Sequence, residues 1–204
     1  MKRSTCKICH FSVKTCVCSH ISEPICNKTH VVVLQHPSEL TTAKNTVRLL
    51  SLQLKNIQVF VGEAPSDFEQ AQEIARQNKC ALLYPGEDAL AVEDIKPDQT
   101  QIDYLFVLDG TWKKAHKLAM LNPWLKELPQ VSFNSPPANQ YKIRKAEQQY
   151  SLSTLEACAY FLSAYDALDT TPLYTLLEGM IFEQTKFMPE HVKARYLDND
   201  DSTE

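Results

Sequence analysis

From residue 30 onwards the chain alternates between short apolar runs and longer amphipathic stretches. Five of the runs are typical of buried strands: HVVVLQ at 30–35, IQVFV at 57–61, CALLY at 80–84, YLFVL at 104–108 and QVSF at 130–133. They are apolar on both faces, which is the pattern of strands in a parallel sheet that helices cover on both sides. We therefore expect an α/β domain with a mostly parallel sheet.

Helical periodicity separates the predicted strands. Five helices are predicted, at 40–54, 68–75, 111–121, 151–166 and 172–187. Ser38 is expected to cap the first helix, Ser66 and Asp67 the second, and the pair Asn122–Pro123 to end the third. In sheets with such crossover connections, ligands bind at the carboxyl ends of the strands.

Composition is that of an ordinary globular protein, with 44% hydrophobic and 23% charged residues among 204. We expect three parts: a Cys-rich appendage at 1–29, the main domain at 30–190 and an acidic, disordered tail at 191–204. No apolar run approaches the length of a membrane span, and the first residues lack the apolar stretch of a signal peptide. The cytoplasm is the predicted location.

The number of glycines and the distribution of charge along the chain limit the possible functions. Only four Gly are present, and neither a G-x-G-x-x-G nor a Walker motif occurs, which argues against those nucleotide-binding folds. The net charge of −4 hides two blocks, 1–60 and 111–150, in which Lys and Arg outnumber Asp and Glu. These blocks suit a polyanionic partner, although solvated faces of opposite sign would look the same.

Cysteines cluster near the N-terminus in the pattern C-x2-C-x6-C-x-C. The four residues are Cys6, Cys9, Cys16 and Cys18. Four thiolates this close can enclose a structural Zn²⁺ and leave no open position for catalysis, whereas free thiols or a redox pair are the alternatives. His10, His20 or Cys26 could replace one ligand. Cys80 and Cys158 lie within apolar patterns and are predicted to be core residues.

Polar residues follow three predicted strands: Gln35-His36-Pro37, Tyr84-Pro85-Gly86-Glu87 and Asp109-Gly110-Thr111-Trp112. Asp109 either caps the next helix or takes part in chemistry at the sheet edge. His36 is more typical of a hydrogen-bonded turn than of a catalyst. Trp112 is either a core or lid residue or a platform for a base.

Basic residues lie beyond the third strand end. They are Lys113, Lys114, His116 and Lys117, followed after a loop by Lys142, Arg144 and Lys145. Together with Trp112 and Tyr141 they suit a nucleic-acid backbone and an unstacked base. A solvated helix face would have the same composition.

The segment LFVLDGTWKKAHKL resembles the signature of the DTW-domain family, with Asp109, Thr111 and Trp112 at the D-x-T-W positions. Further matches occur in the family's order over about residues 6–160: both cysteine pairs, VLQHPSE, Asn45-Thr46, Arg48-Leu49-Leu50, LYPGEDA, LNPWLKELP, Arg144-Lys145-Ala146 and SLSTLEA. One departure is that 10–15 reads HFSVKT, whereas family members commonly carry Arg-Pro between the cysteine pairs.

The resemblance implies a bacterial tRNA-uridine aminocarboxypropyltransferase with a knotted, SPOUT-like domain. It would transfer the 3-amino-3-carboxypropyl group of S-adenosylmethionine (SAM) to N3 of a tRNA uridine and release 5′-methylthioadenosine. A structural zinc is expected, and neither a membrane nor an obligate protein partner is implied. The implied SAM-binding residues are Leu83, Tyr84, Pro85, Gly86, Leu108, Asp109, Gly110, Leu152, Ser153 and Thr154. We predict Asp109, Thr111 and Trp112 as catalytic residues, and Lys113, Lys114, Lys117, Arg144 and Lys145 as RNA contacts.

Two roles stay open for Asp109, which could accept the uridine N3 proton or hold the donor. The helix start at Ser153 and Thr154 could bind the donor's carboxylate. Two other functions also stay open: a SAM-dependent RNA methyltransferase, and a catalytically inactive, zinc-dependent RNA-binding module.

Overall fold

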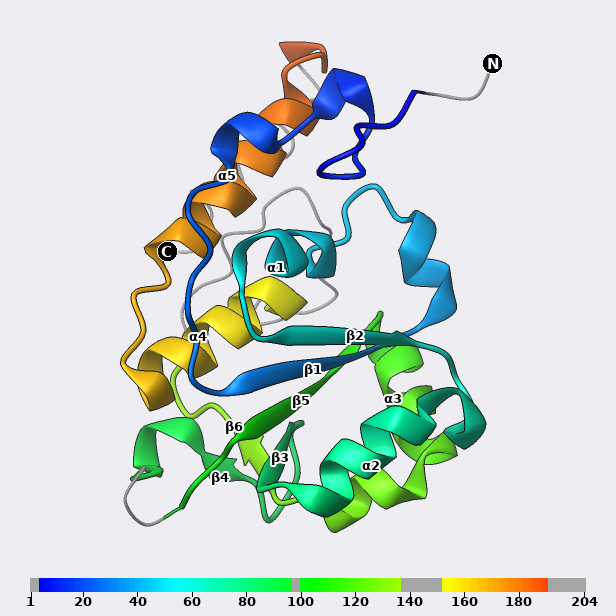
Figure 1. Cartoon of the computed structure of the whole chain (residues 1–204), viewed down its shortest axis with the longest axis vertical. Helices are drawn as coiled ribbons and strands as arrows, with labels where there is room; N and C mark the ends of the chain where they lie inside the picture. Colours follow the sequence, from blue (N-terminus) through cyan, green and yellow to red (C-terminus); the bar gives the residue numbers. More distant parts are fainter. Residues whose placement is uncertain (1–3, 97–99, 137–151, 191–204) are drawn as a thin grey trace, which may run out of the picture.

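The computed structural model describes residues 4–96, 100–136 and 152–190, and these ranges contain one six-stranded, all-parallel sheet (Figure 1). Its strands are β1 His30–Gln35, β2 Ile57–Val61, β3 Cys80–Leu83, β4 Leu90–Ala91, β5 Tyr104–Asp109 and β6 Gln130–Ser132. They lie in the order β2-β1-β5-β3-β6-β4. The predicted α/β class and parallel sheet are therefore confirmed. The sequence pattern missed β4 because two residues are too few to show a period.

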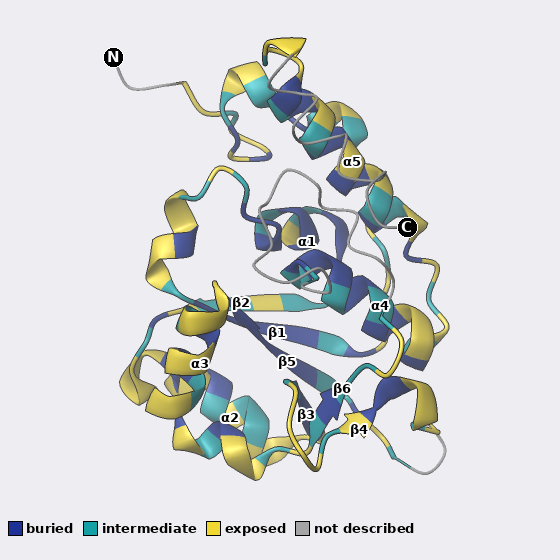
Figure 2. Cartoon of the chain, turned by 180° about the vertical axis from the view of Figure 1, so that it is seen from behind, coloured by how far each residue is buried: buried dark blue, intermediate teal, exposed yellow. Residues whose placement is uncertain are grey.

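Helices cover both faces of this sheet (Figure 1). One layer consists of α1 Val47–Gln53, α4 Thr154–Asp166 and α5 Thr171–Thr185; the other consists of α2 Glu69–Gln77 and α3 Trp112–Leu121. Alternate residues of each strand serve the two layers: Leu105 and Val107 of β5 pack with α4 and α5, whereas Phe106 and Leu108 pack with α2 and α3. Figure 2 shows the central strands buried between these layers.

Short 3₁₀ helices occupy many of the connections. They are η1 Val13–Thr15, η2 Cys18–His20, η3 Pro37–Thr41, η4 Pro65–Phe68, η5 Val92–Asp94 and η6 Pro123–Glu127. No helix in the described ranges is long and apolar enough to cross a membrane.

The helix predicted over 40–54 is wrong in its first half. The chain forms η3, becomes extended at Thr42 and begins α1 only at Val47. Ser38 is not a cap, because its backbone N–H donates to Nδ1 of His36, which caps η3. The predicted hydrogen-bonded turn at His36 is confirmed.

The caps predicted for the second helix are also wrong. The carboxylate of Asp67 accepts hydrogen bonds from the backbone N–H groups of Glu63 and Ala64 and so stabilises the N-terminal end of η4. Helix α2 begins after Phe68 and has no side-chain cap. The third helix ends at Asn122 as predicted. Cys80 and Cys158 are buried, as expected.

The described part of the Cys-rich segment packs against the main domain. Cys9, Phe11 and Val17 belong to the larger core cluster, and His20 lies so close to α5 that a Cβ on Gly179 would come within 2.3 Å of its ring. The boundaries 1–29, 30–190 and 191–204 stay a prediction, and the acidic tail lies outside the described residues. The knotted path also stays a prediction, because the connection that leads into α4 includes 137–151, likewise outside them.

A substitution at Tyr165 tests how buried backbone groups obtain their hydrogen bonds in this fold. Its hydroxyl accepts from Ile102 N at 2.7 Å and donates to Thr100 O at 2.9 Å. Tyr165→Phe should lower the free energy of unfolding by about 1–3 kcal/mol, because the buried N–H loses its acceptor. Urea denaturation measures this, with Tyr104→Phe as control, since no hydrogen bond of the Tyr104 hydroxyl to described residues is found. Equal stability of the two variants would contradict this account.

Candidate active site and metal centre

The carboxyl ends of β1 and β5 bring a buried carboxylate together with three polar side chains. Gln35 and Asp109 are register partners at the ends of these strands. Asp109 is 3% exposed; its Oδ2 accepts from Gln35 Nε2 at 2.8 Å and from Asn45 Nδ2 at 2.9 Å. Its Oδ1 accepts from Thr154 Oγ1 at 2.6 Å. Strand β1, the loop before α1 and the start of α4 therefore meet at one carboxylate.

Asp109 does not cap the helix that follows it. Successive residues of a strand face opposite sides of the sheet, so Leu108 packs with the α2 and α3 layer while Asp109 faces α4. The cap of α3 is Thr111, whose Oγ1 accepts from Lys114 N at 3.4 Å. The capping alternative for Asp109 is therefore wrong.

The negative charge of Asp109 has no cationic partner among the described residues. Its three hydrogen-bond donors are neutral amide and hydroxyl groups. Burial, followed by the charge of Asp109, raises the pKa of the Cys158 thiol on α4, so that thiol stays protonated at neutral pH. A buried carboxylate with this environment favours a positively charged ligand.

The start of α4 is a well-capped turn beside Asp109. Ser153 Oγ accepts from Glu156 N at 3.3 Å, and Glu156 Oε2 accepts from Ser153 N at 2.8 Å, which completes a capping box. Thr46 Oγ1 accepts from Leu155 N at 3.4 Å. Of the three residues predicted here, the structure brings Thr154 into contact with Asp109, with Leu152 and Ser153 preceding it in the turn.

The other predicted SAM-binding residues lie at the ends of β3 and β5. Leu83 ends β3 beside Val107, and Tyr84 and Pro85 follow it. Gly86 lies against β6, since a Cβ would be 2.1 Å from Gln130 Oε1. At Gly110, after Asp109, a Cβ would be 2.8 Å from Cβ of Lys114, so the turn into α3 is tight.

Trp112 lies with α3, on the layer opposite to the one that Asp109 faces. It is 46% exposed and makes an edge contact with Tyr84, at 6.5 Å between ring centroids. Tyr84 Oη lies 3.4 Å from Nδ1 of His116. Thr111 and Trp112 therefore follow Asp109 in the chain, but no contact of their side chains with its carboxylate is found.

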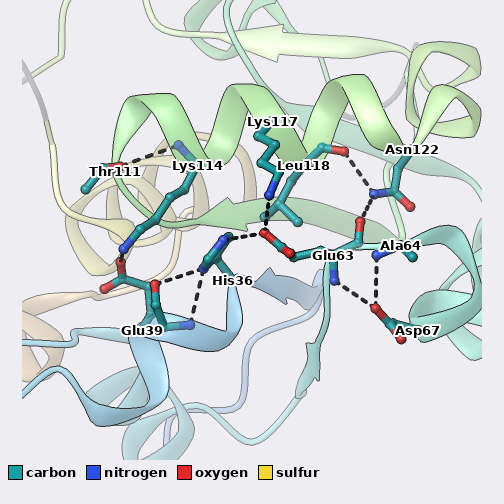
Figure 3. A network of polar contacts seen from close by, with 11 residues as sticks. His36, Glu39, Glu63, Ala64, Asp67, Thr111, Lys114, Lys117, Leu118 and Asn122 are labelled. Atoms are coloured by element: carbon teal, nitrogen blue, oxygen red, sulfur yellow. Dashed lines mark hydrogen bonds and ion pairs between the residues drawn. The ribbon is translucent and has the colours of Figure 1, made fainter.

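Two of the predicted RNA-binding lysines are ion-paired (Figure 3). Lys114 Nζ lies 2.8 Å from Glu39 Oε1, and Lys117 Nζ lies 2.9 Å from Glu63 Oε1. The hydrogen bond from Lys117, reinforced by His36, holds the pKa of Glu63 below its usual range.

Lys113 is exposed, and no ion pair joins it to another described residue. Arg144 and Lys145 lie outside the described residues.

The family model named DTW domain matches residues 3–185. The chain belongs to the DTW domain family. Three curated relatives bear the name tRNA-uridine aminocarboxypropyltransferase 2. They come from Drosophila melanogaster (31% identical, covering 97% of this chain and 77% of the relative), Mus musculus (30%, 79% and 56%) and Macaca fascicularis (29%, 79% and 56%).

The chain thus spans little more than half the length of the mouse and macaque relatives. These relatives are eukaryotic, whereas the resemblance implied a bacterial enzyme. No solved structure matches the chain significantly.

The DTW domain also carries a candidate metal centre. The Sγ atoms of Cys6, Cys9, Cys16 and Cys18 lie within 4.8 Å of one another. The Cys6–Cys18 and Cys9–Cys16 pairs are each 3.6 Å apart, close to the roughly 3.8 Å that tetrahedral Zn–S bonds of about 2.3 Å require. These four residues therefore fit Zn²⁺.

Local backbone shape supports the cysteine cluster. His10 takes the left-handed conformation (φ 58°) directly after Cys9, and Cys6 N donates to Phe11 O. Backbone N–H groups of Cys9 and Ile8 point at the Cys6 thiol and lower its pKa to about 6, which favours the thiolate that binds metal. Neither His20 nor Cys26 belongs to the cluster, and His20 instead pairs with Glu183 on α5.

Metal analysis tests this centre. We expect the purified protein to contain about one zinc per chain, because four thiolates complete a tetrahedral shell. Cys9→Ser should lose the metal, whereas the matched change Cys26→Ser, at an exposed cysteine outside the cluster, should keep it. Elemental mass spectrometry measures both variants. Zinc retained at full occupancy in Cys9→Ser would contradict the assigned ligand set.

Proposed function

We propose that this protein transfers the 3-amino-3-carboxypropyl group of SAM to N3 of a uridine in tRNA. The observation that carries this proposal is the buried carboxylate of Asp109, which lies where the strands of this DTW domain end. No cationic side chain among the described residues pairs with it. The sulfonium of SAM has the charge that this carboxylate favours. The names of the curated relatives support the same reaction.

In this reaction uridine N3 bonds to the arm carbon that adjoins sulfur, and the bond between that carbon and sulfur breaks. The electron pair of the broken bond leaves with 5′-methylthioadenosine, and the N3 proton passes to solvent water. A sulfonium has three electrophilic carbons, so the product depends on which carbon the site presents to N3. The protein's main task is therefore to orient the donor.

Asp109 serves best, in this proposal, as the negative charge that holds the donor. A carboxylate offers about four acceptor positions, and three of them receive hydrogen bonds from Gln35, Asn45 and Thr154. Little capacity is left for taking a proton from uridine. Thr111 and Trp112 would act by setting the turn between β5 and α3.

The four thiolates would hold a structural zinc, and the basic residues would hold tRNA phosphates. Lys113 is exposed, and no ion pair joins it to another described residue. Lys117 would exchange its exposed carboxylate partner for phosphate, which costs little because exposed ion pairs are weak. Lys114 would have to leave Glu39, whose carboxylate is buried, and this exchange costs more. Arg144 and Lys145 remain proposed contacts.

Mass spectrometry of nucleosides tests the proposed reaction. Unmodified tRNA incubated with the protein and SAM should yield aminocarboxypropyl-uridine, with methylthioadenosine released. Asp109→Ala should lower the transfer rate by at least about 10²-fold with tRNA binding nearly intact, because the donor loses its counter-charge. Asp103→Ala, at the opposite end of β5, is the control and should keep the wild-type rate.

Two other results would contradict the proposed reaction. A methylated nucleoside would make the protein a methyltransferase. If no nucleoside changes and SAM does not bind, an RNA-binding module is the better account.

Salt-dependent tRNA binding tests the basic face. Lys113→Ala should weaken binding and reduce the slope of log K against log salt by about 0.7–0.9, because one phosphate contact is lost. Lys79→Ala, before the first residue of β3 and thus at the other edge of the sheet, should leave both quantities unchanged. Filter binding at several salt concentrations measures them, and equal effects of the two substitutions would remove Lys113 from the interface.

A further inference from the structure

Asn45 is held in a single orientation beside Asp109. It lies buried in the loop between η3 and α1, and its Nδ2 donates to Asp109 Oδ2 at 2.9 Å. Its Oδ1 accepts from Arg48 N at 3.3 Å and from Gln35 Nε2 at 3.4 Å. Because one end of an amide donates and the other accepts, these contacts exclude the flipped amide.

The surroundings of Asp109 present a hydrogen-bond donor to each of its two oxygens. Asn45 and Gln35 present N–H groups to Oδ2, and Thr154 presents its hydroxyl to Oδ1. Gln35 Nε2 also reaches Asn45, so the two amides support each other. If Asn45 is removed, Oδ2 loses one of its two donors, and only Gln35 and Thr154 still fix the orientation of the carboxylate.

We propose that Asn45 is a positioning residue for the transfer reaction, acting through the carboxylate of Asp109. Its amide fixes where the negative charge lies relative to the donor. Gln35 assists from β1. The inference rests on the proposed function, because it assigns Asn45 a role in the same reaction.

Replacing this amide with a carboxylate gives a test that depends on pH. In Asn45→Asp, two carboxylates would share the site, and like charges at hydrogen-bond distance raise the pKa of the pair. When the pair has lost both protons, the carboxylates repel and Asp109 is displaced. When pH falls through the raised pKa, one shared proton restores the donor to Asp109. The variant should therefore recover activity relative to wild type as pH falls.

Neighbouring titratable groups do not reproduce this behaviour. On α4, Cys158 faces Asp109, and burial keeps its pKa raised, so it stays protonated. Glu156 lies in the first turn of α4, and its carboxylate accepts from Ser153 N. Cys158 and Glu156 are present in wild type and in every variant. Dividing the activity of a variant by that of wild type at the same pH therefore cancels the effect of these two groups.

The experiment measures kcat and KM for SAM and tRNA in wild type, Asn45→Ala and Asn45→Asp, from about pH 6 to pH 9, where ordinary carboxyl groups stay ionised. Asn45→Ala should lose about 10²-fold in kcat at every pH, with KM for tRNA unchanged. Asn45→Asp should show a similar loss at high pH and a smaller one at low pH. Thermal unfolding of each variant confirms that it is folded.

Asn27→Asp is the matched control. Asn27 is also a buried amide, and it donates to backbone carbonyls of Thr29 and Asn56 near the amino end of β1. It should lower stability while leaving the activity ratio to wild type independent of pH. A purely structural role of Asn45 would give the same result as this control.

The two levels of the proposal fail in different ways. An active wild type with an unchanged kcat in Asn45→Ala, or with a pH-independent ratio in folded Asn45→Asp, overturns the positioning role and leaves the proposed function standing. A wild type that forms no aminocarboxypropyl-uridine overturns the proposed function and this inference with it.

Discussion

The arrangement at the carboxyl edge depends on keeping one carboxylate buried. An unpaired charge in a low-dielectric interior is costly unless hydrogen bonds compensate it, and Asp109 receives three. Each donor comes from a different element: Gln35 from β1, Asn45 from the loop before α1 and Thr154 from α4. A single side chain thus ties together two neighbouring segments of the chain, β1 and the loop before α1, with the start of α4, which is distant from both in sequence. The parallel pairing of β1 and β5 makes this possible, because it places Gln35 opposite Asp109.

Helix α3, in the layer on the opposite face of the sheet, is joined by ion pairs to the loops at the carboxyl ends of the strands. Lys114 joins α3 to Glu39 of η3, and Lys117 joins it to Glu63, which follows β2 and also contacts His36. The exposed Lys117–Glu63 pair contributes little to stability alone and weakens with salt, whereas the carboxylate of Glu39 is buried and its pair with Lys114 is screened less. The proposed exchange of carboxylate for phosphate at Lys117 depends on this weakness. In the proposed function, α3 would brace these loops and also face the tRNA.

The sequence predicted the sheet well and its edge less well. The five predicted strands are present. Strands β1, β3 and β5 are apolar runs buried on both faces, whereas β2 is a partly exposed edge strand. The helix predicted from Leu40 was wrong because helical spacing of apolar residues says nothing about Asn45, whose side chain turns inward to Asp109. The position of Asp109 before a helix is also typical of a helix cap. Successive side chains of β5 face opposite sides of the sheet, and Asp109 therefore faces α4. The position of α4 depends on the tertiary structure, which sequence rules for helix caps do not include.

Arg48 connects the cysteine cluster with the carboxylate site. Its guanidinium donates to the carbonyls of His10 and Leu40 and lies 4.8 Å from the ring centroid of Phe11. Its backbone N–H meanwhile donates to Asn45 Oδ1, the amide that orients Asp109. The turn between the cysteine pairs and the loop that holds Asn45 therefore share one residue. A structural metal that orders this turn would also support the loop on which the geometry of Asp109 depends, although the four cysteines are far from Asp109 in the sequence.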